Sequence, residues 1–456
     1  MGNRKKASLF LTIGIILFVL VVLSWFVFSI FEGESPRVIL SPRPEYLSET
    51  RKFSLSASDM KRGLRDLTVV LSQEGRRFEI LKKSFPFTGL FNREGTRSYH
   101  TEFSVDPSQL NLSQGRADLA VRVWDYSRRR GGDGNMTVVH HKMIVDTIPP
   151  AIRAVSRLNY ITVGGTCLVV YQTSSDAVES GIFVGDLFFK GYPAIENSQE
   201  GYHVCYFTVP PTMLPIPEIS LGAVDRAGNS SRTGFYYHIR RKRFRTVRMN
   251  ITDRFLQRVL PRFSSYGFDP GSSDIDKFLK INRQMRKENA RTFFLLKDKS
   301  GLSQLWKGRF LRLKNAATMA GFGDRRLYYY HGKKIDEQVH MGVDLASLAN
   351  SQVRAANNGR VIYADRLGIY GNTVVIDHGQ GVASAYSHLS RISVENGQEV
   401  VRGSEIGLTG QSGLAGGDHL HFAILVNGRF VDPVEWWDGH WIEDNINKKL
   451  ARLGSP

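Results

Sequence analysis

Hydrophobic and polar positions along the chain follow three successive patterns. Residues 8–31 form one run without a charged side chain, and roughly 20 apolar residues in a helix span the core of a bilayer. Most of the remaining sequence places short β-branched or aromatic runs between Gly, Asp, Asn and Ser, which is typical of strands. Residues 250–298 instead carry helical signals. The pattern predicts a mainly β chain with an N-terminal transmembrane helix, tandem Ig-like β-sandwich domains, a short helical segment and a C-terminal antiparallel β domain.

The N-terminal run has the features of an uncleaved membrane anchor. Basic residues 4–6 precede it and Glu32 and Glu34 follow it, so the positive-inside rule places residues 1–7 in the cytoplasm as a short stub. A cleaved signal peptide, the alternative, has a shorter apolar core and small residues at its cleavage site, where this chain has bulky aromatic side chains. We therefore expect residues 8–31 to cross the inner (cytoplasmic) membrane once, with the rest of the chain in the periplasm or otherwise outside the cytoplasm.

The chain is strongly basic. It has 61 Lys and Arg residues against 43 Asp and Glu residues, and a formal net charge of +18. Such a charge implies an anionic partner. Because most of the chain is expected outside the cytoplasm, we predict no nucleic-acid partner, and an anionic wall polymer or lipid headgroups fit the charge instead. Residues 240–248 carry six positive charges in nine positions, a pattern that a solvated linker and a contact to an anionic polymer explain equally well.

The two cysteines, Cys167 and Cys205, each stand in a strand-like run. The expected compartment permits disulfides, so the pair forms either a bridge or two small buried side chains. Two cysteines cannot build a zinc–thiolate site. Any metal in this chain must therefore be bound by His and carboxylate side chains.

Two tandem Ig-like domains are predicted at residues 37–147 and 148–240. Asp125 and Asp225 end similar strand-like runs 100 positions apart, which is about one sandwich length, and the prolines at 149–150 separate the two copies. One elongated β domain is the competing interpretation. These domains are also expected to provide surfaces for envelope protein partners. The expected strands of the first copy are residues 53–58, 67–71, 119–124 and 137–145.

The second half of the chain changes character twice. Residues 241–300 predict a basic linker and a helical subdomain, with one helix near 252–260 and another that begins at an N-cap within 272–274. Residues 301–440 return to β patterning, and residues 441–456 are expected to form a C-terminal tail. The expected strands of this last β domain are residues 353–356, 360–364, 372–377, 383–388, 419–425 and 429–431.

Three segments of the predicted C-terminal β domain combine histidine with strand periodicity. In an extended segment His340 and Asp344 lie on one face, and the glycine midway between them leaves room for a metal. His419 and His421 likewise share a face, and His388 ends a further strand-like run, where on its own it would be a core or turn histidine. Two imidazoles and one carboxylate form the ligand set of a catalytic zinc, with the fourth position open to water. Two further histidines then remain for proton transfer.

Residues 321–434 resemble peptidase family M23, the LytM/lysostaphin type. The resemblance covers about a quarter of the chain and says nothing directly about residues 1–300. The matching motifs occur in this order: Gly321–Arg325, His340-x-x-x-Asp344-Leu-Ala, Val361–Ala364, Tyr370-Gly-Asn through His378-Gly, Tyr386-Ser-His-Leu, Gly403–Gly407, His419-Leu-His-Phe, Asn427-Gly and Asp432-Pro433.

By this resemblance, His340, Asp344 and His421 would bind one Zn²⁺ per chain. His388 and His419 would be the catalytic pair, with one imidazole assisting proton transfer and the other stabilising the oxyanion. The sequence leaves open which histidine has which role. Because all five positions are filled, the sequence favours an active enzyme.

The resemblance further implies a zinc-dependent endopeptidase that hydrolyses peptide cross-links of bacterial peptidoglycan and therefore binds its stem peptides. The alternative is a non-catalytic scaffold or activator of other cell-wall hydrolases. Tyr370, Asn372 and Gly413 are predicted to contact substrate. Gly413 belongs to the Gly-rich segment 410–417, which forms either a wall of the substrate groove or an ordinary hairpin loop. Asp418 departs from the family pattern, which often has Pro or a small residue there, and this puts only the local charge in doubt.

Overall fold

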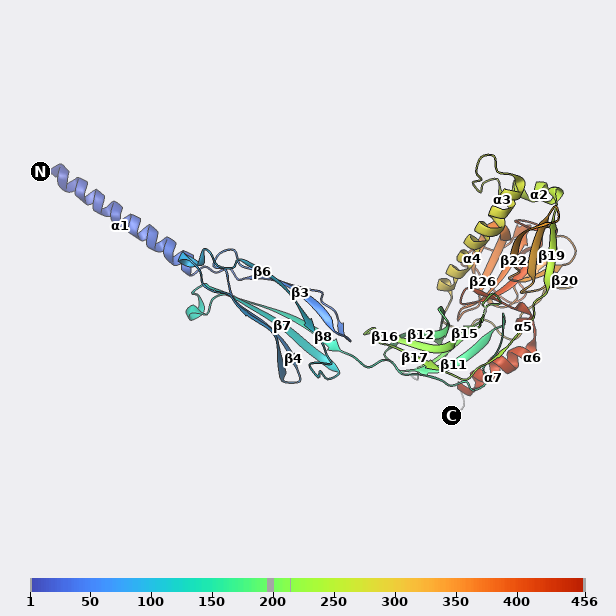
Figure 1. Ribbon diagram of the computed structural model, residues 1–456, viewed down its shortest axis with the longest axis horizontal. Helices are drawn as coiled ribbons and strands as arrows, with labels where there is room; N and C mark the ends of the chain where they lie inside the picture. The colour runs from blue at the N-terminus through green and yellow to red at the C-terminus, as the bar shows by residue number, and fades with distance from the viewer. Residues whose placement is uncertain (1, 195–200, 214, 454–456) are drawn as a thin grey trace. The chain divides into compact units, whose positions relative to one another are not determined.

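The chain is mainly β, as predicted, and begins with an apolar helix (Figure 1). The computed structural model describes residues 2–194, 201–213 and 215–453. The chain forms two compact units, which comprise residues up to 149 with 226–229, and residues 150–225 with 230 onward.

Helix α1 (Gly2–Ile30) opens the first unit. Its segment Lys5–Ile30 is long and apolar enough to cross a membrane, and its apolar side chains from Leu9 to Phe28 are exposed. The predicted anchor is thus a helix that presents an apolar surface on all sides, as a lipid-facing segment does.

A β-sandwich completes the first unit. One sheet has the order β1-β3-β6 and the other has the order β2-β8-β7-β4-β5. Phe53 and Leu55 of β3 and Leu67 and Val69 of β4 are fully buried in one apolar core, because alternate side chains of each strand point inward. The bounds are β1 (Arg37–Ser41), β2 (Tyr46–Leu47), β3 (Arg51–Ser58), β4 (Leu64–Gln73), β5 (Arg76–Ser84), β6 (Ser98–Val105), β7 (Gly115–Asp125) and β8 (Met136–Val145).

A second β region opens the second unit. It contains two four-stranded sheets, β14-β15-β11-β9 and β13-β12-β16-β17, and a parallel pair β10-β18. The bounds are β9 (Ile152–Ala154), β10 (Tyr160–Thr162), β11 (Cys167–Thr173), β12 (Ala177–Val184), β13 (Leu187–Lys190), β14 (Tyr192–Pro193), β15 (Tyr202–Phe207), β16 (Ile219–Asp225), β17 (Ser230–Gly234) and β18 (His238–Arg240).

The two β regions share a local strand register. Leu64 at the start of β4 pairs with Asp125 at the end of β7, and Ala177 at the start of β12 pairs with Asp225 at the end of β16. A register shift follows the first residue of β4 and of β12 alike. The aspartates that indicated a repeat in the sequence therefore occupy equivalent strand ends.

The cysteines lie on adjacent strands without forming a bridge. Cys205 of β15 stands opposite Val169 of β11, whereas Cys167 stands opposite Phe207. Both thiols are free and buried, and burial raises the pKa of each above its ordinary value. Of the two alternatives left open by the sequence, the structure has two small buried side chains.

An eight-stranded antiparallel sheet forms the C-terminal β domain. Its strand order is β20-β23-β31-β27-β26-β25-β29, with β32 paired to β31, and β24-β30-β28 form a smaller sheet. All six expected strands of this domain are present, within a few residues of their predicted bounds. The bounds are β20 (Ala317–Ala320), β23 (Val343–Ala346), β24 (Gln352–Arg354), β25 (Gly359–Leu367), β26 (Gly371–Asp377), β27 (Val382–Leu389), β28 (Arg391–Ile392), β29 (Glu399–Val400), β30 (Glu405–Leu408), β31 (Leu420–Val426) and β32 (Arg429–Val431).

The basic run leads directly into this domain. Strand β19 (Thr246–Ile251) pairs in parallel with β21 (Arg325–Tyr330), which in turn pairs with β22 (Lys333–Val339). The end of the run is therefore built into a sheet, which a freely solvated linker does not explain.

Helices fill the segment between β19 and β20, as the sequence indicated. Thr252 caps α2 (Asp253–Val259) and Ser273 caps α3 (Asp274–Lys280), each through its side-chain oxygen. A π-helical turn connects α3 to α4 (Arg286–Leu295). In Figure 1 these helices lie beside the strands of the C-terminal β domain.

The second β region packs against the C-terminal β domain through polar and aromatic contacts. The backbone N–H of Thr166 donates to the carboxyl group of Glu435 at 2.7 Å, and the side chain of Asn427 donates to the carbonyl of Tyr206 at 2.9 Å. Their apolar side chains share one core. The two regions therefore act as one folded unit.

The segment expected as a C-terminal tail is helical. It includes α6 (Gly439–Ile442) and α7 (Lys448–Leu450), which follow α5 (Pro433–Trp437). The buried ammonium of Lys449 donates to the carbonyl of Leu168 at 2.7 Å. The tail thus packs onto the second β region, and only its last residues, 454–456, lie outside the described part of the chain.

Candidate metal centre and histidine pair

Three neighbouring strands of the eight-stranded sheet carry or adjoin the predicted ligands and the histidine pair, and His340 lies in the segment between β22 and β23. Asp344 in β23 lies directly opposite His421 in β31, and on its other side His421 lies opposite Ser387 in β27. His388 follows Ser387 in β27, and His419 stands immediately before β31. The antiparallel register thus brings together residues that are up to 77 positions apart in the sequence.

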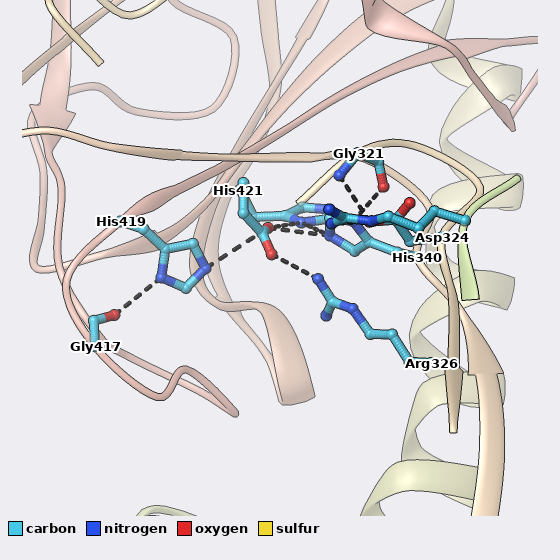
Figure 2. A network of polar contacts seen from close by, with 9 residues as sticks. Gly321, Asp324, Arg326, His340, Gly417, His419 and His421 are labelled. Carbon is cyan, nitrogen blue, oxygen red and sulfur yellow. Dashed lines mark hydrogen bonds and ion pairs between the residues drawn. The ribbon is translucent and has the colours of Figure 1, made fainter. Parts of the chain in front are cut away.

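His340, Asp344 and His421 form one buried polar cluster (Figure 2). The Nε2 atom of His340 lies 3.0 Å from Oδ1 of Asp344 and 3.0 Å from Nδ1 of His421, and that Nδ1 atom lies 2.9 Å from the same carboxylate oxygen. Burial alone would raise the pKa of Asp344, but His340 and His421 outweigh burial and hold that pKa well below its ordinary value. The cluster therefore contains a carboxylate anion.

Backbone and side-chain partners fix the orientation of His340. Its Nδ1 atom donates to the carbonyl of Gly321 at 2.8 Å, so its Nε2 lone pair faces the cluster. The carboxylate of Asp324 in turn accepts from the backbone N–H of Gly321 and from Arg245, each at 3.0 Å. Figure 2 shows Gly321 and Asp324 beside His340. Outer partners of this kind orient metal-binding imidazoles.

The donor set and its packing fit a zinc ion. Two imidazoles and one carboxylate are a three-ligand set that leaves a position open. One ligand atom from each of the three side chains lies within 4.8 Å of the other two. The atom that His421 contributes is Nδ1, whereas its Nε2 atom faces position 342. The glycine expected to leave room for a metal, Gly342, instead makes room for the His421 ring, since a Cβ atom at position 342 would lie 2.5 Å from Nε2.

Arg326 is a site residue that the sequence interpretation missed. Its guanidinium donates to Oδ2 of Asp344 at 2.7 Å, while the other carboxylate oxygen faces the histidines. The only signal in the sequence that could have indicated Arg326 was its place in a strand, where alternate side chains share a face. Its neighbour Arg325 lies on the other face and donates to Glu337. Arg326 thus neutralises and orients the carboxylate from the side away from the cluster.

His388 and His419 form the second half of the site. The centroids of their rings lie 4.8 Å apart. Nδ1 of His388 donates to the carbonyl of Ser412 at 2.9 Å, and Nδ1 of His419 donates to the carbonyl of Gly417 at 2.9 Å. Nε2 of His419 lies 3.6 Å from Oδ1 of Asp344. Burial, with the neighbouring histidines, lowers the pKa of His388 well below its ordinary value, so this imidazole is neutral at neutral pH.

The backbone of His388 is strained. Its φ angle is +64°, a left-handed conformation that costs a residue other than glycine about 1–3 kcal/mol and concentrates at functional positions. This conformation occurs one residue before the end of β27, at the residue whose imidazole donates to the carbonyl of Ser412.

The three predicted substrate residues lie in or beside the Gly-rich segment 410–417. Tyr370 is 6% exposed, and the centroid of its ring lies 5.4 Å from the centroid of the His421 ring. The backbone N–H of Asn372 donates to the hydroxyl of Ser412 at 2.9 Å. Gly413 has a φ of +68°, and a Cβ atom there would lie 2.4 Å from the backbone nitrogen of Gly371. These residues join the Tyr370 segment to the Gly-rich segment beside the cluster.

The geometry defines a β-sheet domain that carries a candidate metal centre of two histidines and one aspartate beside a second pair of histidines. Residues 338–433 match the family described as Peptidase family M23. The chain therefore carries a peptidase family M23 domain toward its C-terminal end.

Curated relatives match this part of the chain. It is 42% identical over 98 residues to DD-carboxypeptidase/endopeptidase Mpg of Neisseria meningitidis, and 40% identical over 96 residues to peptidoglycan DD-endopeptidase ShyA of Vibrio cholerae. Each match covers 21% of this chain and 22% of the relative. It is also 38% identical over 95 residues to murein hydrolase activator EnvC of Escherichia coli, which covers 21% of this chain and 23% of the activator. The chain thus spans less than a quarter of the length of each of these relatives.

Among solved structures, the chain is similar to the catalytic domain of the antimicrobial peptidase lysostaphin from Staphylococcus simulans. The two are 28% identical, with a TM-score of 0.24, and the match covers 27% of this chain and 94% of that domain.

Proposed function

We propose that this protein is a zinc-dependent endopeptidase that hydrolyses peptide cross-links of bacterial peptidoglycan in the cell envelope. The observation that carries the proposal is the convergence of the His340, Asp344 and His421 cluster with the His388 and His419 pair. The match to a peptidase family and relatives named as peptidoglycan endopeptidases support the choice of reaction and substrate.

In the proposed site His340, Asp344 and His421 hold one Zn²⁺. When bound, the ion lowers the pKa of a water molecule and polarises the scissile carbonyl. The protein keeps the ligands in place through Arg326 on the carboxylate and the Gly321 carbonyl on His340. The single carboxylate leaves the site with a net positive charge, which favours a developing oxyanion.

His388 and His419 act on protons. Because each Nδ1 atom donates to a backbone carbonyl, each Nε2 atom is the position of its ring that can exchange a proton, and that of His419 faces Asp344 at 3.6 Å. One imidazole accepts a proton from the attacking water and returns it to the leaving amine. The other, as an imidazolium that carries protons on both Nδ1 and Nε2, donates a hydrogen bond from Nε2 to the oxyanion.

Substrate contacts fall to the loops that border the cluster. Tyr370, Asn372 and Gly413 form one side of the proposed groove for a stem peptide, and glycine backbone lets an extended peptide approach closely. The α1 helix would anchor the enzyme in the inner membrane, with the N-terminus in the cytoplasm and the peptidase domain in the periplasm. Both Ig-like regions would be available to envelope protein partners.

A non-catalytic activator of other wall hydrolases is the second candidate. The similarity to EnvC, which is named as a murein hydrolase activator, favours it. The complete set of five site residues favours the enzyme. The two functions differ in one observable, which is the release of peptides from wall material by the purified chain alone.

Digestion of wall sacculi tests the proposal. The full chain in detergent, loaded with zinc, should release cross-linked peptides in a chelator-sensitive manner. His340→Ala and His388→Ala should each abolish release, whereas His440→Ala, which removes an exposed histidine outside the cluster, should retain it. If the wild-type chain releases nothing but stimulates a separate wall hydrolase, the activator function replaces the enzyme.

A further inference from the structure

The Gly-rich loop, residues 410–417, presents its carbonyl groups in two directions. The carbonyls of Ser412 and Gly417 accept hydrogen bonds from His388 and His419. The carbonyls of residues 411, 413 and 415 face the other way. This loop is therefore the shared backbone support of both histidines.

One guanidinium holds the opposite side of the loop. Nη1 of Arg262 donates to the carbonyls of Gln411, Gly413 and Ala415, with distances of 3.1 Å to the last two. Alternate residues of the loop thus face Arg262, and Ser412 between them faces His388. Hydrogen bonds from a charged donor are roughly twice as strong as those between neutral groups.

Arg262 lies far outside the family match at residues 338–433. It belongs to a short helical turn, Leu260–Phe263, that follows α2. Leu260 and Phe263 on either side are buried in the core of the second unit, and the carbonyl of Arg262 itself accepts from Arg366. The arginine is therefore fixed at its base, so it can hold the loop rather than follow it.

The loop needs such a support. Four of its eight residues are glycine, and glycine has more conformational freedom to lose on ordering than any other residue. Contacts of Ser412 with Asn372 and Leu389 hold one side of the loop. Without Arg262 the carbonyls on the other side lose their donor, so the Ser412 and Gly417 carbonyls would sample positions from which they accept less well from the two imidazoles.

We propose that Arg262 is a positioning residue of the active site. Its guanidinium fixes the Gly-rich loop, and the loop holds His388 and His419 with Nδ1 protonated and Nε2 turned toward the Asp344 cluster. This inference rests on the proposed function. It assigns a role in catalysis to the helical segment, which lies outside the family match at residues 338–433.

The test compares Arg262→Ala with Arg254→Ala in the zinc-loaded full chain. Arg254 is an exposed arginine of α2 and serves as the matched control. With a soluble cross-linked stem peptide, Arg262→Ala should lower kcat about 100-fold, the scale expected for misplaced catalytic groups. Zinc content should change little, because Arg262 contacts none of the three ligand residues. KM should change less than kcat, because Arg262 touches the proposed groove only through the backbone carbonyl of Gly413. Hydrogen exchange in the peptide that covers the Gly-rich loop should accelerate, and Arg254→Ala should match the wild type throughout.

Arg262→Lys keeps the charge but loses the planar fork, so it should recover part of kcat and part of the loop's protection. A kcat for Arg262→Ala equal to that of the control would overturn the inference while leaving the proposed function intact. Equal losses of zinc content, thermal stability and activity in both Arg262 variants would also overturn the inference, because the role of Arg262 would then be to stabilise the fold rather than to position the histidines. An inactive wild-type chain would instead refute the proposed function.

Discussion

Replacing Gly342 by alanine would place a methyl group against the His421 imidazole. The added Cβ would lie 2.5 Å from Nε2, 2.6 Å from Cε1 and 2.7 Å from the carbonyl oxygen of Phe422. An ordinary contact begins at 3.4 Å, so ring or strand must move by 3.4 − 2.5 = 0.9 Å. Because the His421 ring lies between Gly342 on its Nε2 side and the Asp344 carboxylate on its Nδ1 side, this movement should displace the imidazole relative to Asp344.

Two measurable losses of different size should follow. Overpacking in a close-packed region costs about 1–3 kcal/mol, which urea unfolding of the metal-free protein would measure. Misplacing one imidazole by about 1 Å should weaken zinc binding at least as much as loss of an outer-shell partner does, roughly 10–100-fold. Zinc affinity is measured by competition with a chromophoric chelator.

Gly234→Ala is the matched control for this substitution. Gly234 ends strand β17, and no atom lies within 4 Å of a Cβ built there, so the control should change neither zinc affinity nor stability appreciably. If Gly342→Ala bound zinc as tightly as the wild type, the His421 ring would not be a metal ligand in the arrangement described, and the assignment of the cluster would be wrong.

Two further outcomes are expected of the second unit. Burial raises the pKa of Glu435 from 4.5 to about 8, so the folded protein keeps a proton that the unfolded chain loses, and stability should fall as pH rises between these two values. Glu435→Gln should remove this fall in a pH series of thermal midpoints, and parallel curves for the two proteins would contradict the assignment. A fragment of residues 300–456 lacks β19 and α2–α4 and should fail to digest sacculi, whereas residues 150–456 should fold and digest them. Activity of the shorter fragment would show that the helical segment is dispensable.

Local patterns in the sequence were sufficient to predict the strands of the C-terminal β domain and the grouping of its histidines. Period-two alternation places His419 and His421 on one face of a strand whether or not its neighbours are known. The same alternation put His340 and Asp344 together. The five residues were found because their chemistry is unusual and their spacing short, and the family resemblance then assigned their roles.

Residues that reach the site from elsewhere left no such signal. Arg326, Arg245 and Arg262 are three of many arginines in a basic chain, and nothing in their neighbourhood distinguishes them from surface charges. Their roles depend on which strand pairs with which. The parallel pairing of β19 with β21 joins residues about 79 positions apart, and no local pattern encodes such a pairing.

The boundary of the proposed catalytic unit follows from these long-range contacts rather than from the change in hydrophobic pattern near residue 300. Arg245 supports the loop that orients His340, Arg262 supports the loop that orients His388, and the side chain of Asn289 accepts from the backbone of Ile369 at 2.9 Å. All three supporting residues precede residue 301. The β domain alone contains the five chemical groups, but the positions of those groups are set by side chains that the preceding helices and strand deliver. A site of this kind works as a property of the whole second unit, because imidazoles displaced by 1 Å lose most of their catalytic effect even when every one of them is present.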